Sequence, residues 1–123
     1  MGKPAQQLTK AIRDYLTLNG WFVWRGGSTA SRNKDGGFYI TGQPGSPDLY
    51  AIKCDNNWID MRVDIVGIEV KAGKDRVSPM QLAFHQSFAK HGGQIIVART
   101  LQDVISALGG AARGQETVSG RPE

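Results

Sequence analysis

Two short apolar segments that each carry charged residues constrain this chain more than any other feature. In Gly45–Ile52 an aspartate, Asp48, directly follows a proline, and in Val66–Lys71 the charged residues Glu69 and Lys71 interrupt an apolar run. Both segments have the composition of strands. Because burying an unpaired carboxylate costs a large part of the stability of a small domain, these charges need partners.

Strand geometry predicts where the partners lie. Alternation places Glu69 and Lys71 on the same face, about 6 to 7 Å apart. Asp48 is expected at the start of its strand, because the preceding proline cannot donate a ladder hydrogen bond. The two carboxylates and the ammonium group can then meet at one end of a sheet, with oxygen ligands that suit Mg²⁺ or Mn²⁺. Taken alone, Glu69 and Lys71 are more simply an ion pair on a half-exposed strand.

The composition limits the size, the partners and the location of the protein. A chain of 123 residues has the size of one domain. Its 15 Lys and Arg against 11 Asp and Glu give a net charge of +4, as expected for a nucleic-acid binder. A single cysteine, Cys54, excludes an intramolecular disulfide. With no apolar run near the ~18 residues of a membrane span and no signal-peptide pattern, we expect a cytoplasmic protein that does not enter the membrane.

The first half of the chain predicts a helix, a strand and a long loop. Helical spacing of apolar residues extends over Pro4–Asn19 and ends at an Asn-Gly stop signal. Trp21–Arg25 is an aromatic strand that we expect beside the Asp48 strand. Gly26–Gly45 is rich in Gly, Ser and charged residues and predicts a loop, with a short extended piece at Phe38–Ile40.

Basic residues near this loop suggest contacts with DNA phosphates. Arg25 precedes the loop, and Arg32 and Lys34 lie among its glycines, so one hypothesis is a mobile phosphate-contacting arm. The alternative is a solvated flexible loop. A second polar loop, Gly73–Arg76, adds two candidates for DNA binding, Lys74 and Arg76.

The second half begins with a turn at Asp55–Asn57 and an ambiguous segment, 58–64. Ser78, followed by Pro79 and Gln81, then gives a capping-box start for a helix that stops near His91. We expect two further elements, the strand Gln94–Ala98 and the helix Leu101–Leu108.

This order predicts an α/β fold with a small mixed sheet flanked by helices. The Glu69 and Gln94 strands should be parallel, because the connection between them has the length of a helical crossover. We expect one domain over residues 1–109 and a disordered tail at 110–123, which has almost no apolar content.

Four motifs in this order carry a family resemblance. They are Gly45–Asp48, Ile68–Lys71, Ser78–Gln81 and Gly92–Arg99. Together they resemble the VRR-NUC domain, the virus-type replication-repair branch of the PD-(D/E)XK nucleases. The resemblance implies a restriction-endonuclease-like core and a metal-dependent endonuclease. Stand-alone members of this size act as homodimers on branched DNA such as Holliday junctions.

The resemblance also implies roles for individual residues. Asp48 and Glu69 match the carboxylates that bind Mg²⁺ or Mn²⁺, and the Val70 carbonyl is a further ligand. Lys71 matches the lysine that positions water or stabilises phosphate charge. Gln81 matches a glutamine near the site, although its place in the capping box already explains it.

One residue departs from the family pattern. Members usually carry a glutamate on the first helix facing the metal, where this chain has Gln7. Gln7 can serve through a water molecule, or the metal site is weaker and holds one ion. Two functions therefore stay open: a Mg²⁺- or Mn²⁺-dependent endonuclease, and a DNA-binding module of the same fold with little or no activity.

The remaining candidates have simpler interpretations. His85 and His91 are expected to be surface imidazoles rather than ligands or general bases, with His91 at a helix end that favours a cation. Trp21 and Trp24 are expected in the core or a dimer interface, rather than in a base-stacking platform, since only Arg25 adds positive charge there.

Overall fold

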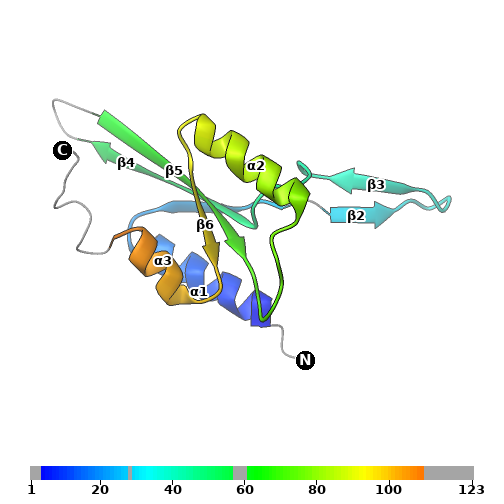
Figure 1. Cartoon of the computed structure of the whole chain (residues 1–123), viewed down its shortest axis with the longest axis horizontal. Coiled ribbons are helices and arrows are strands. Elements are labelled where there is room, and N and C mark those ends of the chain that lie inside the picture. Colours follow the sequence, from blue (N-terminus) through cyan, green and yellow to red (C-terminus); the bar gives the residue numbers. More distant parts are fainter. Residues whose placement is uncertain (1–3, 28, 57–60, 110–123) are drawn as a thin grey trace.

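The computed structural model describes residues 4–27, 29–56 and 61–109 (Figure 1). The predicted tail at 110–123 and the segment around Trp58 lie outside these residues. The described elements, in chain order, are α1 (Pro4–Leu18), β1 (Phe22–Arg25), β2 (Thr29–Arg32), β3 (Phe38–Thr41), β4 (Leu49–Asn56), β5 (Met61–Val70), α2 (Pro79–Lys90), β6 (Gln94–Ala98) and α3 (Leu101–Ala107).

Four strands form one mixed sheet in the order β1-β4-β5-β6. The pairs β1–β4 and β4–β5 are antiparallel, whereas β5 and β6 are parallel and joined through α2. The predicted α/β class is therefore confirmed, as are the place of β1 beside β4 and the parallel pairing of β5 with β6.

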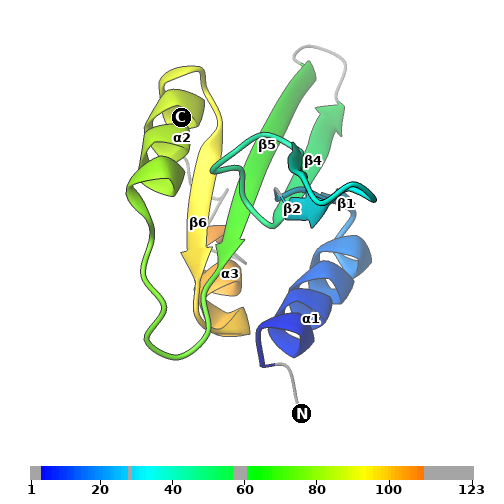
Figure 2. The same ribbon diagram turned by 90° about the vertical axis from the view of Figure 1, so that its right-hand side faces the viewer.

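The helices cover the two faces of this sheet unequally. Helices α1 and α3 lie on one face and α2 on the other (Figures 1 and 2). The core lies between the sheet and the α1–α3 pair, where Ile12 and Leu16 of α1 and Val104 of α3 are fully buried. Alternating strand residues complete this core: Leu49, Ala51, Val66, Ile68, Val70, Ile96 and Ala98.

The helix boundaries follow their sequence signals. Helix α1 ends just before Gly20, whose φ of 89° lies in the left-handed region that glycine adopts without strain. Helix α2 begins at Pro79 after the N-cap Ser78, with the complete capping box. Its C-cap is His91, so this helix is confirmed at both ends.

The long loop predicted for Gly26–Gly45 is wrong in part. Strands β2 and β3 pair antiparallel as a hairpin, and only the extended piece at Phe38–Ile40 was expected. The hairpin closes through the backbone hydrogen bonds Asn33 N to Gly37 O (2.7 Å) and Gly36 N to Asn33 O (3.2 Å). Strand β2 escaped prediction because its residues, Thr-Ala-Ser-Arg, lack an apolar alternation.

The predicted turn at Asp55–Asn57 begins too early. Asp55 and Asn56 belong to β4 and pair with Arg62 and Met61 of β5, while Asn57 lies outside the described residues. Polar residues continue the ladder here because a ten-residue partner strand supplies their backbone hydrogen bonds.

Candidate active site

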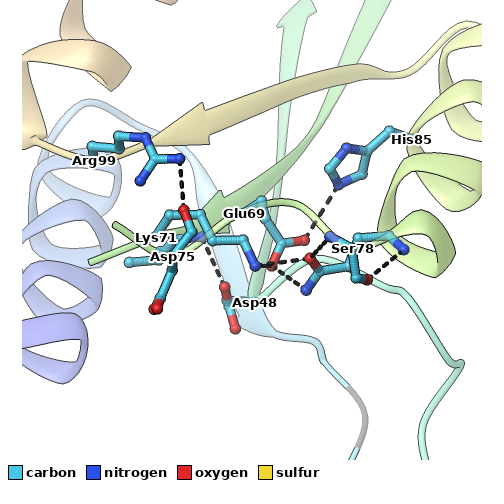
Figure 3. Close-up of polar contacts among 9 residues, drawn as sticks. Asp48, Glu69, Lys71, Asp75, Ser78, His85 and Arg99 are labelled. Carbon is cyan, nitrogen blue, oxygen red and sulfur yellow. Dashed lines mark hydrogen bonds and ion pairs between the residues drawn. The ribbon is translucent and has the colours of Figure 1, made fainter. Parts of the chain in front are cut away.

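The candidate site forms where β4 begins and β5 ends. These strands are antiparallel, and the pairing of Leu49 with Ile68 brings the preceding Asp48 next to Glu69. The backbone N–H of Val70 donates a hydrogen bond to Asp48 Oδ2 at 2.8 Å (Figure 3). The register of β4 against β5 therefore places the Asp48 carboxylate beside Glu69.

Close backbone packing holds the segment before Asp48 in place. Pro47 lies over Gly67, where an added Cβ would come within 2.7 Å of the proline Cγ. The N–H of Gly26 donates to the carbonyl of Asp48 at 2.8 Å, and a Cβ on Gly26 would meet the Pro47 carbonyl at 2.5 Å. Glycine at both positions lets β1 and β5 approach this segment closely.

Glu69 is the most enclosed charged residue of the site, with 2% of its surface exposed. Its Oε2 accepts a hydrogen bond from Gln81 Nε2 at 3.0 Å and lies 3.8 Å from Lys71 Nζ. Its Oε1 lies 3.3 Å from His85 Nε2 (Figure 3). Three polar side chains therefore surround one buried carboxylate, as burial of a charge requires.

Gln81 links the helix cap to the site. Its Oε1 accepts hydrogen bonds from Lys71 Nζ (2.8 Å) and from the backbone N–H of Ser78 (2.9 Å), while Ser78 Oγ accepts from Gln81 N (3.1 Å). The two interpretations of Gln81 are thus compatible, because the amide closes the capping box with its oxygen and contacts Glu69 with its nitrogen.

The electrostatics of the site disfavour two ionised carboxylates side by side. Burial and, next, the neighbouring Asp48 carboxylate raise the pKa of Glu69 to about 7, although Lys71 acts in the opposite direction. Burial and the Lys71 charge both lower the pKa of His85. A neutral His85 can donate through Nε2 to an ionised Glu69, but it adds no charge that would offset the two carboxylates.

The donor set fits a divalent cation. Two adjacent carboxylates, whose repulsion contributes to the raised pKa of Glu69, are hard oxygen donors of the kind that Mg²⁺ and Mn²⁺ bind. Within residues 4–27, 29–56 and 61–109, no group of three or more His, Cys, Asp or Glu is arranged to hold a metal. A metal at this position would therefore depend on main-chain carbonyl and water ligands in addition to Asp48 and Glu69.

One expectation about the histidines is wrong. His85 is not a surface imidazole: it is buried on α2 and faces Glu69. It lies one helical turn after Gln81, so the same face of α2 presents both side chains to the site. His91 is exposed, as expected, and its Nδ1 lies 2.8 Å from the Ser87 carbonyl oxygen.

The remaining predicted residues lie around the site rather than in it. Gln7 is exposed on α1 and makes no hydrogen bond to the site residues in the part of the chain that the structure describes. The exposed basic residues are Arg25 at the end of β1, Lys34 in the hairpin turn, and Lys74 and Arg76 after Lys71. Arg32 ends β2, and its side chain is outside the described set.

Arg99 is a residue that sequence reasoning did not single out. Its guanidinium donates from Nη1 to the Gly73 carbonyl (3.1 Å). It also donates from Nη2 to the Asp75 carbonyl (2.7 Å), as Figure 3 shows. These two hydrogen bonds connect the end of β6 to the loop that follows Lys71. Its place after an apolar strand gave no local signal, because the contact joins residues 24 and 26 positions apart.

One of the comparisons with known proteins identifies a family. The family model for the VRR-NUC domain matches residues 37–101, more than half of the chain, including all four residues of the predicted catalytic set. No curated protein and no solved structure matches the chain. Among the described residues, no helix has the length and apolarity to cross a membrane. On the evidence of the family match and the arrangement of Asp48, Glu69 and Lys71, this chain belongs to the VRR-NUC family of nuclease domains.

Proposed function

We propose that this protein is a Mg²⁺- or Mn²⁺-dependent endonuclease that hydrolyses phosphodiester bonds in branched DNA. The observation that supports it most is the convergence of two carboxylates from adjacent strands with the ammonium group of Lys71. Membership of a nuclease family supports the reaction class. We also propose that the protein is cytoplasmic and that residues 1–109 form a single nuclease domain.

Asp48, Glu69 and the main-chain carbonyl of Val70 are the proposed metal ligands. When bound, a divalent ion neutralises phosphate charge and makes a water molecule a better nucleophile. Asp48 is held for this role by the Val70 N–H, and Glu69 by the Gln81 amide. Their fixed positions avoid the reorganisation that mobile carboxylates would need during the reaction.

Lys71 is proposed to act on the phosphate or on the attacking water. Its ammonium lies 2.8 Å from Gln81 Oε1 and 3.8 Å from Glu69 Oε2, and it is nearly buried. In such a desolvated position a positive charge stabilises developing negative charge more strongly than it would in water. Gln81 orients both Lys71 and Glu69, so we assign it a positioning role within the catalytic set.

DNA binding is proposed to use the exposed basic residues around the site, since contacts with phosphates position a nuclease without reading sequence. These residues are Arg25, Arg32, Lys34, Lys74 and Arg76. A chain with one active site cuts one strand at a time, so symmetric cleavage of a junction requires a two-fold homodimer. The preference for branched DNA and the homodimer rest on the resemblance to stand-alone family members.

The test is a cleavage panel with duplex, flap, splayed and four-way DNA, each in Mg²⁺, Mn²⁺ or EDTA. We expect metal-dependent nicking that is strongest on branched substrates and absent in EDTA. Cleavage that persists in EDTA would contradict the metal requirement, and equal cleavage of all four substrates would contradict the structural preference.

The second candidate is a DNA-binding module with weak or no cleavage. Gln7 favours it, because an exposed amide on α1 supplies no charge to the site where family members usually have an acid. The cleavage panel separates the two candidates, and a Gln7→Glu variant tests whether position 7 lies near the metal. If the site holds a metal near α1, the variant binds Mn²⁺ more tightly than the wild type in a calorimetric titration. An unchanged titration would show that position 7 does not reach the ion.

A further inference from the structure

A groove of about 540 Å³ opens beside the candidate active site, between α2 and the segment that leads to Asp48. Its volume falls in the range of pockets that bind small organic groups. The lining is mainly apolar and includes Pro44, Met80, Ala83, Phe84, Ser87 and Phe88. The family match and the proposed reaction assign this groove no role.

Two stretches of backbone lie between the groove and the site. Met80 lines the groove and is followed directly by Gln81, while Pro44 precedes Asp48 by four residues. These two stretches are in tight contact, because an added Cβ on Gly45 would come within 2.5 Å of the Met80 carbonyl. The groove therefore lies only a few residues away from the carboxylate site along both segments, so a nucleotide next to a phosphate at Asp48 and Glu69 is the part of the DNA nearest to the groove.

Aromatic rings extend from the groove across the sheet. Phe84 and Phe88 are stacked with centroids 5.8 Å apart, and Phe88 lies 6.0 Å from Tyr50. Tyr50 in turn stacks on Trp24 at 5.4 Å. Trp24 is 37% exposed, so the row reaches solvent. Aromatic faces of this kind stack on nucleobases with little dependence on sequence.

The helix that lines the groove carries no acidic residue. From Arg76 to Gln102 the sequence contains no Asp or Glu, and this stretch includes the whole of α2. It does contain the basic residues Arg76, Lys90 and Arg99. A polyanion that lies along α2 therefore meets no like charge from the helix itself.

We propose that the groove binds the base of an unpaired nucleotide next to the scissile phosphate. This inference rests on the proposed nuclease function and names the feature of branched DNA that the protein recognises. Bases within a duplex are stacked and cannot enter the groove, whereas unpaired bases at a branch can do so at a smaller energetic cost. The preference for branched substrates then comes from each protomer and does not require two of them.

The test measures binding in EDTA, so that no cleavage is needed. The full chain is titrated with a duplex that carries one unpaired 2-aminopurine at a branch and with the fully paired control. The groove variants are Ala83→Glu, which brings negative charge into the lining, and Phe84→Leu, which keeps apolar volume but removes the stacking ring. Gln86→Glu, exposed on the same helix and outside the groove, is the charge-matched control.

We expect the wild type to quench 2-aminopurine fluorescence and to bind the unpaired substrate more tightly than the control. Both groove variants should weaken this binding by about tenfold, and Gln86→Glu by less than about threefold. Equal effects of Ala83→Glu and Gln86→Glu would overturn the proposal. So would a change of oligomeric state in Ala83→Glu on size-exclusion chromatography, because the groove would then be an interface between copies of the chain.

The outcomes separate the groove from the nuclease function. Specific quenching without any cleavage in Mg²⁺ or Mn²⁺ would refute the proposed reaction and leave the groove intact. Metal-dependent cleavage without quenching, and with equal binding of both substrates, would refute the role of the groove and support the proposed reaction.

Discussion

The two faces of the central sheet are built for different purposes. On the face toward α1 and α3, the side chains of Leu49, Ala51, Val66 and Ile68 have no exposed surface. On the face toward α2, the charged residues Glu69 and Lys71 are buried, and the outer strand carries the exposed aromatic rings of Phe22 and Trp24. One face therefore carries most of the hydrophobic stabilisation, and the other is available for chemistry.

This division explains how a small domain tolerates the charged groups of its candidate active site. Two neighbouring ionised carboxylates are unfavourable in a metal-free interior, as the raised pKa of Glu69 indicates. The opposite face compensates for this cost through the close packing of Ile12, Leu16 and Val104 against the strands. The predictions below test whether function and stability are separated in this way.

The largest expected effect is on catalysis and comes from the α2 face. Asp48→Asn and Lys71→Ala should each reduce cleavage of branched DNA at least about a hundredfold, because the first weakens the proposed metal site and the second removes the positive charge beside the reacting phosphate. Binding of the same DNA should change little. Single-turnover cleavage and fluorescence anisotropy measure the two quantities. Cleavage that persists in both variants would refute the assignment of the site.

A pair of identical substitutions compares stability on the two faces. Val66→Ala, at a fully buried position of the packed face, should lower the free energy of unfolding by about 2 kcal/mol. Val97→Ala, at a position 37% exposed on the other face, should lower it by less than about 1 kcal/mol. Urea denaturation in EDTA measures both. Equal losses would contradict the division between the faces.

Glu69 should destabilise the metal-free protein above neutral pH. Its pKa in the folded state, about 7, lies above the ordinary value of 4.5, so the folded state retains a proton that the unfolded state releases. The free energy of unfolding should therefore fall as the pH rises from about 4.5 to about 7 and then level off.

Glu69→Gln should remove this dependence. At pH 8 in EDTA the variant should be more stable than the wild type by about 1 to 2 kcal/mol, and at pH 4 nearly equal to it. The variant should also fail to cut DNA. A wild type whose stability does not change between pH 4.5 and 7 would show that Glu69 has an ordinary pKa.

The smallest expected effects are on DNA binding outside the site. Lys34→Ala and Arg25→Ala should each lower the slope of log K against log salt by about one unit, because each removes a phosphate contact. Lys10→Ala, whose ammonium is paired with Asp14 on α1 at 2.7 Å, is the matched control and should leave the slope unchanged. If all three variants kept the wild-type slope, Lys34 and Arg25 would make no contact with DNA phosphates.

The sequence predicted those features that depend on local chemistry. The capping box at Ser78, the helix stop at Gly20 and the charged positions in β5 all carry signals within a few residues, and the structure agrees with each. The parallel pairing of β5 and β6 also followed from the length of one connection.

What could not be predicted depends on contacts between distant segments. The burial of His85 arises only when α2 is placed over Glu69, sixteen residues earlier. The hydrogen bond from Val70 to Asp48 depends on the register of β4 against β5, and the anchoring of the Gly73–Asp75 loop depends on Arg99, which directly follows β6. Local patterns contain no information on such pairings.

The most direct test of the account is a calorimetric titration of Mn²⁺ into the metal-free protein and into Asp48→Asn, both at pH 8, where Glu69 is mostly ionised. We predict saturable binding by the wild type and at least about tenfold weaker binding by Asp48→Asn, with the melting temperature of the metal-free variant retained or raised. Equal Mn²⁺ affinities in the two folded proteins would contradict the central claim that Asp48 and Glu69 together hold the catalytic metal.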